Sequence, residues 1–430
     1  MLSASDNELL IRSGAATPAG QYLRRFWLPV ALSRELPAVD GPPIRLKVMG
    51  EELIAFRDSN GRVGLVEPRC PHRGANLFFG RNEGCGIRCV YHGWKFDVEG
   101  NCLEMPNAPP DSNYKDRVRI VAYPTREFGE MVWAYMGPAG HEPELPALEI
   151  GVVPDSHRYV IKKLQQCNWA QSMEGALDTA HFSFLHMPAP SVSANVNRDA
   201  PVDEGRLRWV REDPMPRFSI VDHEVGFVIG AARRADGNEL YWRTTQYLLP
   251  SHSTTPSALP GETYFGYTWM PIDDVSCWIY TYAWNPDRPL GEAERAKMTS
   301  GHGTLAAVDA NFIPLRNRDN DYLIDRTEQQ TISFTGVRGV AEQDAMIQDS
   351  QGFIVDRTKE NLTATDAGVV RFRQTFLSGV KSLAEGTEPA AAMRGSAYHL
   401  RSGSWIADKS HSFEEVMVQR FGDPIGRVAG

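Results

Sequence analysis

The sequence predicts an α+β protein, in which a small all-β domain precedes a larger domain with an antiparallel sheet flanked by helices. Three observations predict this class. Residues 44 to 138 read as short strands broken by turns, residues 240 to 284 hold longer alternating runs, and residues 367 to 377 have the pattern of an amphipathic helix. A chain of 430 residues has room for two or three domains with separate cores.

The all-β domain is indicated by closely spaced strand and turn signals. The runs 53–56 and 63–66 flank Asn60-Gly61, a dipeptide typical of tight hairpin turns. The run 131–136 is another strand candidate, and the Pro-rich stretch 140–146 reads as a linker. We therefore expect an N-terminal segment at 1–25 that packs with the larger domain, the all-β domain at 26–138, and the larger domain at 139–430.

The larger domain contains three candidate antiparallel strands, at 240–249, 264–270 and 277–284. In the last of these, four aromatic side chains alternate and fall on one face: Trp278, Tyr280, Tyr282 and Trp284. Such a stripe usually packs a sheet against helices, and the alternative is that it forms the wall of an aromatic pocket.

The composition excludes several classes of protein. A net charge of −9 argues against a nucleic-acid surface, which needs clustered Lys and Arg. No apolar run approaches the roughly 18 residues that a membrane helix needs, and the acidic N-terminus does not resemble a signal peptide. Six cysteines are too few for a disulfide scaffold, so we expect a cytoplasmic protein whose thiolates are free to bind metal.

A first motif has the form C-x-H…C-x-x-H. It consists of Cys70 and His72, followed after 16 residues by Cys89 and His92. Mixed zinc sites usually pair Cys with Cys and His with His, whereas here each short loop supplies one of each. This pairing suits a Rieske 2Fe–2S cluster, in which two thiolates bind one iron and two imidazoles bind the other. We interpret Cys85, Cys102, Cys167 and Cys277 as ordinary buried thiols.

A second motif has the form D-x2-H-x4-H and comprises Asp178, His181 and His186. Asp178 and His181 would share one face of a helix. His181 and His186 are five positions apart, which in a continuous helix turns them about 140° from each other. Both can reach one metal only if the helix ends near them, and Pro188 and Pro190 favour such an ending. Two His and one carboxylate are the ligands that Fe(II) uses to activate O2.

Together the two motifs resemble the α subunits of Rieske non-haem iron oxygenases that hydroxylate aromatic rings. The resemblance runs from Gly20-Gln-Tyr-Leu-Arg-Arg-Phe-Trp27 to the helix after Asp366, and it is strongest to the phthalate 4,5-dioxygenase, chlorobenzoate and phenoxybenzoate branch. It implies a helix-grip type of catalytic domain that holds mononuclear Fe(II). It further implies His181 and His186 as ligands, and Asp178 as a carboxylate that accepts hydrogen bonds from His181 and from His92 of a neighbouring subunit.

The third iron ligand must come from far downstream. By residue type alone, the candidates are Asp309, Asp319, Asp321 and Asp344. The segment 341–352 resembles the part of the phthalate dioxygenase branch that supplies the ligand, so the resemblance favours Asp344. The other three would then be solvated charges or turn residues.

The resemblance also implies the reaction and the partners. An aromatic carboxylate would be hydroxylated with O2, and electrons would come from NADH through a separate reductase that carries flavin and a plant-type 2Fe–2S centre. No G-x-G-x-x-G loop opens a βαβ unit in this chain, which agrees with NADH oxidation elsewhere. The subunits of this branch form homo-oligomers, as trimers or stacked trimers. Two alternatives stay open: a monooxygenase or O-demethylase on an aromatic acid, and a Rieske electron-transfer protein.

A carboxylate substrate needs a cationic anchor. Arg233, Arg234 and Arg243 lie in or beside the strand 240–247, and Arg243 shares a face with Tyr241, Thr245 and Tyr247. A planar guanidinium can bind a carboxylate through two hydrogen bonds. We interpret these arginines as candidate substrate residues, with a surface ion pair as the alternative for each.

Overall fold

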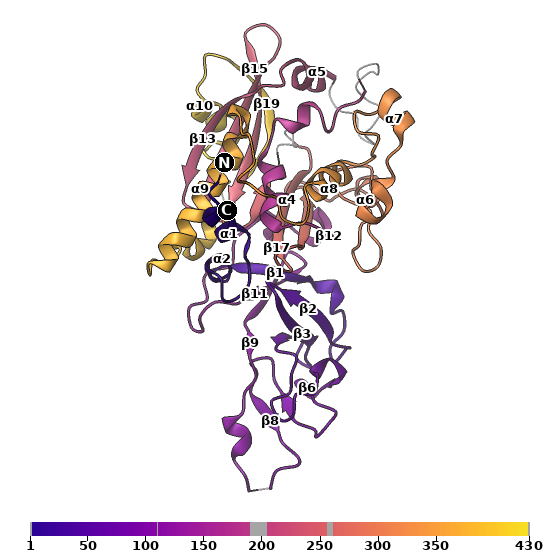
Figure 1. The fold of residues 1–430 in the computed structure, drawn as a ribbon, viewed down its shortest axis with the longest axis vertical. Coiled ribbons are helices and arrows are strands. Elements are labelled where there is room, and N and C mark those ends of the chain that lie inside the picture. Colours follow the sequence, from indigo (N-terminus) through magenta and orange to yellow (C-terminus); the bar gives the residue numbers. More distant parts are fainter. Residues whose placement is uncertain (1, 110, 190–203, 256–260, 429–430) are drawn as a thin grey trace. The chain divides into compact units, whose positions relative to one another are not determined.

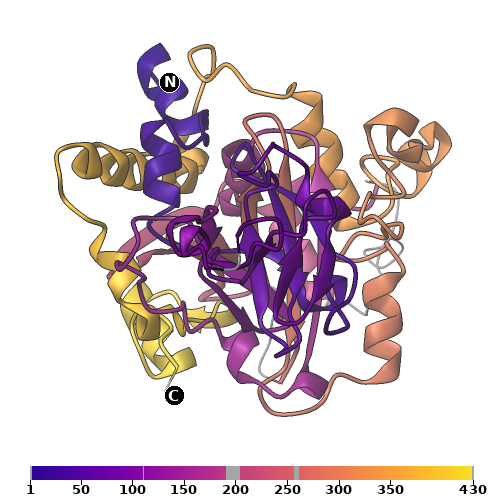
Figure 2. The same ribbon diagram turned by 90° about the horizontal axis from the view of Figure 1, so that it is seen from below.

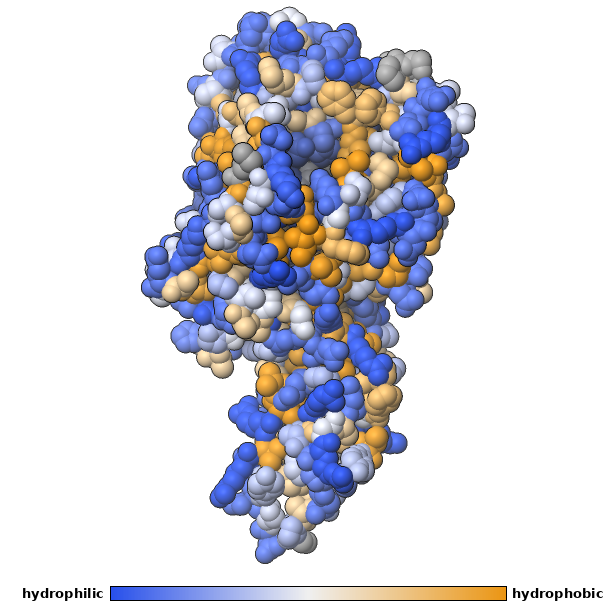
Figure 3. Space-filling model, in the orientation of Figure 1, coloured by the Kyte–Doolittle hydropathy of each residue, from blue (hydrophilic) through white to orange (hydrophobic). Residues whose placement is uncertain are grey.

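The chain forms two compact units in the structure, a computed structural model that describes residues 2–109, 111–189, 204–255 and 261–428. One unit is Ser13–Pro143 and the other combines Met1–Arg12 with Glu144–Gly430. Hydrophilic side chains cover most of the surface that Figure 3 shows. Within the described ranges, no helix is both long and apolar enough to cross a membrane.

The smaller unit is built from three antiparallel sheets with the strand orders β1-β11-β10, β2-β3-β4-β9 and β5-β6-β7-β8 (Figure 1). The predicted hairpin at Asn60-Gly61 is present, and Gly61 has the positive φ of 79° that this turn requires. A buried core that includes Phe56, Trp94 and Phe96 lies beside Cys70 and Cys89. The strands are β1 Trp27–Leu32, β2 Ile44–Val48, β3 Glu51–Arg57, β4 Val63–Val66, β5 Arg81–Glu83, β6 Gly86–Arg88, β7 Lys95–Phe96, β8 Cys102–Glu104, β9 Ala122–Tyr123, β10 Thr125–Phe128 and β11 Met131–Tyr135. The α-helix α2 spans Pro18–Leu23, and short 3₁₀ turns complete the described part of this unit.

The larger unit is organised around an antiparallel sheet of eight strands. Its order is β12-β18-β17-β16-β15-β14-β13, and β19 pairs with the other part of β15. Long runs of β-branched and aromatic residues favour these strands, and β14 and β18 are each buried at all but one position. The strands are β12 Arg158–Gln165, β13 Arg217–His223, β14 Gly226–Arg234, β15 Glu239–Leu248, β16 His252–Thr254, β17 Tyr264–Pro271, β18 Cys277–Trp284 and β19 Ser404–Asp408.

Helices flank this sheet, and within the described residues α4 contacts α1, α8, α9 and strand β17. Trp169 at the start of α4 packs edge-on against Phe376 of α9. Figure 2 shows α1 lying beside α9. The helices are α1 Ala4–Ile11, α3 Glu149–Val152, α4 Trp169–Leu177, α5 Glu204–Glu212, α6 Glu292–Thr299, α7 Arg326–Thr331, α8 Val340–Ser350, α9 Ala367–Ala384 and α10 Phe413–Phe421.

The predicted α+β class, with a small all-β domain and a larger antiparallel sheet flanked by helices, is therefore confirmed. The structure also shows which face of β18 the four aromatic side chains occupy. Ile279 and Thr281, which point the opposite way, line the large cavity of the unit, whereas Tyr280 and Tyr282 are buried on the other face. The stripe therefore packs the sheet and does not form the pocket wall.

Candidate metal centres and substrate cavity

The two Cys–His loops of the smaller unit have the same backbone hydrogen bonds. In the first, the N–H of Gly74 donates to the carbonyl of Cys70 at 2.9 Å, and in the second Gly93 donates to Cys89 at the same distance. Both glycines have positive φ, 75° and 78°, a conformation that other residues rarely adopt. The sequence could show the glycines but not that the two turns are alike.

The four candidate ligands lie at the tips of these loops. Cys70 and Cys89 are buried, and burial beside the second sulfur raises the pKa of the Cys70 thiol to about 11. The rings of His72 and His92 stand edge to face with centroids 4.3 Å apart. Nδ1 of His92 is buried and has no hydrogen-bond partner in the described structure.

These observations fit a Rieske cluster. Two sulfurs lie in the core, two imidazoles lie at the loop tips, and a buried imidazole nitrogen without a partner is an atom that a metal would satisfy. The ring of Trp94 stacks on His72 at 4.6 Å, and its indole N–H donates to Asn107 at 2.7 Å, so the plane of His72 is fixed from one side.

In the larger unit, the second motif lies where α4 ends. The helix stops at Leu177, and Asp178 is its C-cap with extended φ and ψ of −81° and 107°. The expectation that Asp178 and His181 share a helical face is therefore wrong. A short 3₁₀ turn begins at His181, and the chain then carries His186 back towards it. Pro188 follows in an isolated β-bridge, and Pro190 lies outside the described residues.

The helix ends there because Asp178 binds the next turn. Its Oδ1 accepts from the N–H of Ala180 at 2.8 Å and from that of His181 at 3.3 Å, a pattern typical of Asp in turns. Its Oδ2 lies 3.4 Å from Nδ1 of His181. One carboxylate thus shapes the turn and orients the imidazole that the turn carries.

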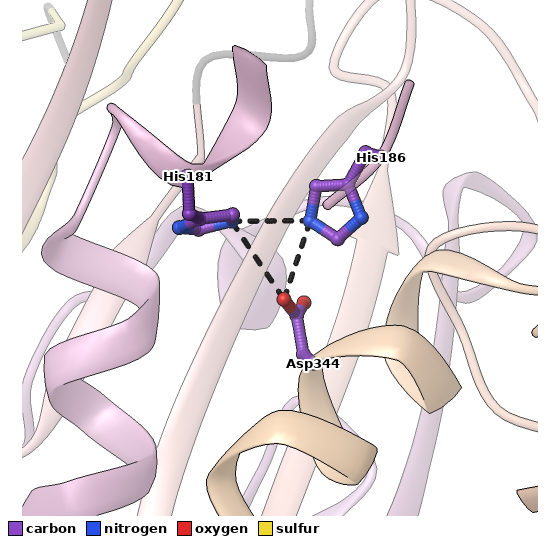
Figure 4. A group of neighbouring side chains, drawn as sticks. All are labelled: His181, His186 and Asp344. Carbon is purple, nitrogen blue, oxygen red and sulfur yellow. Dashed lines mark hydrogen bonds and ion pairs between the residues drawn. The ribbon is translucent and has the colours of Figure 1, made fainter. Parts of the chain in front are cut away.

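The third residue of the site comes from α8. Figure 4 shows Asp344 pointing from this helix towards His181 and His186. The Nε2 atoms of the two imidazoles are 3.1 Å apart. Oδ1 of Asp344 lies 3.7 Å from Nε2 of His181 and 3.2 Å from Nε2 of His186. Of the other carboxylates considered from the sequence, Asp309, Asp319 and Asp321 are exposed and lie outside this group.

The hydrogen bonds of this site indicate where the ring protons are. Nδ1 of His181 faces the carboxylate of Asp178, and Nδ1 of His186 lies 2.7 Å from the amide oxygen of Gln343. Both partners accept, so each Nδ1 is the N–H and each Nε2 carries a lone pair. Two lone pairs and a carboxylate of Asp344 then face one point without a proton between them, which is the arrangement of a metal site.

The pKa shifts agree with a site that attracts positive charge. Burial lowers the pKa of His181, but the contact with Asp178 outweighs it and the net shift is upward. For Asp344, burial raises the pKa, but the contacts with His186 and His181 outweigh burial, so that its carboxyl group ionises more readily than usual. His186 is more deeply buried and its pKa is lowered, which keeps this imidazole neutral and able to bind a metal.

Buried amide contacts connect the two helices that carry the site. Nε2 of Gln171 on α4 donates to the carbonyl of Gln348 on α8 at 2.7 Å. The hydroxyl of Ser172 donates to the side chain of Gln348 at 2.9 Å and accepts from the indole of Trp269 on β17. The Gln171 bond ends on a backbone atom of α8, so it holds this helix, and with it Asp344, in register with α4 whatever side chain stands at position 348.

A cavity of about 810 Å³ opens beside the three residues. Arg243 lines it together with Tyr241 and Thr245 of the same predicted face, whereas Tyr247, the fourth residue of that face, is buried outside the lining. Its guanidinium lies 4.1 Å from the ring centre of Phe182, and its Nε is buried without a hydrogen-bond partner in the described structure. The cavity therefore has in its wall a partly buried cation that an aromatic ring orients.

The other two candidate arginines are placed differently. Arg233 is buried away from the cavity lining and donates to the carbonyl of Thr179 at 2.8 Å. Arg234 is 80% exposed and pairs with Asp213 at 3.5 Å.

Sequence reasoning did not find Lys163 or Arg206, which also line the cavity. Lys163 follows a buried Lys in β12, and such a pair inside a strand of a mostly apolar sheet is a signal that could have been used.

Comparisons with known proteins cover both units. The family described as Rieske [2Fe-2S] domain matches residues 26–124, and the family described as LigXa C-terminal domain like matches residues 134–420. The 3-chlorobenzoate-3,4-dioxygenase oxygenase subunit of Comamonas testosteroni is 35% identical over 434 residues, 98% of this chain and 99% of its own. The phthalate 4,5-dioxygenase oxygenase subunit of Pseudomonas putida is 39% identical over 397 residues, 90% of this chain and 88% of its own.

Two further proteins extend this picture. The 5,5'-dehydrodivanillate O-demethylase oxygenase subunit of a Sphingobium species is 32% identical over 407 residues, 92% of this chain and 85% of its own. Among solved structures, dicamba monooxygenase bound to dicamba has a TM-score of 0.57 at 15% identity and covers 85% of this chain and 99% of its own. The second likeness concerns the fold alone.

Proposed function

The chain belongs to the Rieske non-haem iron oxygenases, and on this basis we propose that it hydroxylates an aromatic carboxylate with O2 and electrons from NADH. The observation that carries the proposal is the convergence of His181, His186 and Asp344 beside a cavity of about 810 Å³ that contains the guanidinium of Arg243. The relatives named for chlorobenzoate and phthalate support an aromatic acid as the substrate.

We assign the metal-binding roles as follows. Cys70, Cys89, His72 and His92 would hold the 2Fe–2S cluster, and His181, His186 and Asp344 would hold Fe(II). When bound, these groups supply electron storage and O2 activation. Three protein ligands would leave the metal able to bind O2, and all three residues line the cavity that would hold the substrate.

The remaining residues bind and orient. Asp178 holds a proton on Nδ1 of His181, so that Nε2 stays available to the metal. Arg243 would bind the substrate carboxylate through two N–H donors, with Phe182 fixing the plane of the guanidinium. A ring held in this way lies in the cavity beside the three ligands, and the buried walls of β15, β17 and β18 exclude water from around it.

The electron donor and the assembly are also part of the proposal. Because the chain has no dinucleotide-binding loop, a separate reductase with flavin and a plant-type 2Fe–2S centre would oxidise NADH. We propose a cytoplasmic homo-oligomer, a trimer or stacked trimers, in agreement with six cysteines that are all free. Light scattering of the purified protein measures the assembly directly.

Turnover of a panel of acids tests the function. The reconstituted system should consume O2 and NADH with at least one of phthalate, chlorobenzoate and phenoxybenzoate, and labelled O2 should leave both atoms in a cis-dihydrodiol. The O-demethylase relative favours a second candidate, a monooxygenase or O-demethylase, which would retain one labelled atom in the product. An electron carrier would turn over none of the acids and would hold about two irons per chain, where the oxygenase holds about three.

A further inference from the structure

The amide of Gln343 holds His186 in one orientation. Its Nε2 donates to the carbonyl of Val337 at 2.8 Å, which fixes which end of the amide is the oxygen. Oε1 then faces Nδ1 of His186 at 2.7 Å. Because an amide oxygen only accepts, Nδ1 must carry the ring proton and Nε2 must be the lone pair that faces Asp344.

The backbone around His186 is fixed by the same segment that receives the amide. The N–H of Phe334 donates to the carbonyl of Met187 at 2.9 Å, and that of Ala189 donates to Ile332 at 2.9 Å. The segment that leads to Val337 therefore pairs with the residues directly after His186. The segment 332–337 therefore fixes the backbone after His186, and through the amide of Gln343 it also fixes the His186 ring.

Gln343 also precedes Asp344 on α8 and is itself buried. One turn of helix thus supplies a candidate ligand and the acceptor that orients another. The two imidazoles are held unequally: His181 faces a carboxylate at 3.4 Å, whereas His186 faces a neutral amide at a shorter distance of 2.7 Å. The carboxylate adds negative charge to one side of the site, and the amide adds none to the other.

We propose that Gln343 is a positioning residue for the mononuclear iron, which fixes the tautomer and ring orientation of His186 without adding charge. This inference rests on the proposed function. Residues that orient a metal-binding imidazole typically contribute 10–100-fold in metal affinity. Gln343→Leu keeps the approximate size of the side chain and removes the acceptor, so Fe(II) affinity should fall by about that factor.

The test compares Fe(II) dissociation constants by anaerobic chelator competition, with Co(II) as a second probe. Gln348→Leu is the matched control, because Gln348 is a buried amide of the same helix that contacts Ser172 and no imidazole. The control should stay within twofold of the wild type. Gln343→Glu presents an oxygen to Nδ1 again and should bind iron at least as well as the wild type.

Four outcomes decide the question. An unchanged affinity in Gln343→Leu overturns the proposal, and so does an equal loss in Gln348→Leu, which would indicate general loosening of α8. An equal loss in Gln343→Glu overturns it too, and this variant serves if Gln343→Leu does not fold. His186→Ala tests the iron site separately: if it retains iron with full affinity, the proposed site itself is wrong, whatever the glutamine variants do.

Discussion

Replacing Arg243 with Ala is the most direct test of how the cavity recognises its substrate. The guanidinium lies 4.1 Å from the ring centre of Phe182, and its buried Nε has no hydrogen-bond partner in the described structure. Substrate binding would therefore break no existing hydrogen bond at that nitrogen. At Nε, the loss of contact with water has already occurred before the carboxylate arrives.

The size of the effect follows from this arrangement. A hydrogen bond to a charged group contributes about 1.5–3 kcal/mol. Because Arg243 is only partly buried and water can solvate the substrate carboxylate after the substitution, we assign about 2 kcal/mol to the whole two-pronged contact. At about 1.4 kcal/mol per factor of ten, Arg243→Ala should raise KM for an aromatic carboxylate about 30-fold. Arg243→Lys retains the charge but not the two-pronged geometry, so its KM should lie between the two.

The assay is steady-state O2 consumption with the acid and with its methyl ester. The ester lacks the charge that Arg243 would bind, so its KM should change little in the variant. Arg234→Ala is the matched control, since Arg234 is 80% exposed and pairs with Asp213 outside the cavity lining. Iron content should be the same in all variants. If KM for every accepted acid stays within twofold in Arg243→Ala, the anchor lies elsewhere and Arg243 is a structural residue.

Three further predictions concern the metal sites and the fold. Asp344→Ala should lose the mononuclear iron while the Rieske absorption persists, because two imidazoles alone hold Fe(II) poorly; full iron content would exclude Asp344 as a ligand. His72→Cys should lower the reduction potential of the cluster, since a thiolate replaces a neutral imidazole, and an unchanged potential and electron paramagnetic resonance signal would contradict the assignment. Burial raises the pKa of Glu149, but hydrogen bonds from Arg401 and Trp284 outweigh it and lower the pKa to about 2. Because the folded pKa is below the unfolded one, this stabilisation is present above about pH 4.5 and is lost as the pH falls towards 2. Glu149→Gln should therefore reduce the free energy of unfolding by on the order of 3 kcal/mol at pH 7 and by less at pH 3.5. An equal reduction at both pH values would contradict this.

Much of the fold could be predicted because its signals are local. The hairpin at Asn60-Gly61 and the alternation in β18 are each set by neighbouring residues, and the structure contains both. The end of α4 could not be placed as well. Helical spacing suggested that Asp178 and His181 share a face, but the Asp178 side chain accepts from the N–H groups of Ala180 and His181, and the helix ends before either Asp178 or His181.

The site residues could be predicted where the metal-binding side chains lie close together in the sequence. Cys70 with His72, and His181 with His186, are close in sequence, so residue type and distance along the chain single them out. Residue type alone left Asp344 among four carboxylates, and only the family resemblance favoured it. Gln343 gave no signal, because an amide has no spacing pattern and its partner His186 lies 157 positions away. Such contacts depend on how α8 packs on α4, which a single sequence does not encode locally.

The likeness of the two Cys–His loops has a consequence for protein design. Both are five-residue tips, from Cys70 to Gly74 and from Cys89 to Gly93, with the same Gly-to-Cys hydrogen bond and the same glycine conformation. They differ in where the imidazole stands, two residues after the cysteine in one loop and three in the other. The backbone conformation of the loop therefore does not depend on where its imidazole stands. A designer can use this loop tip to move or replace a metal-binding side chain without redesigning the turn.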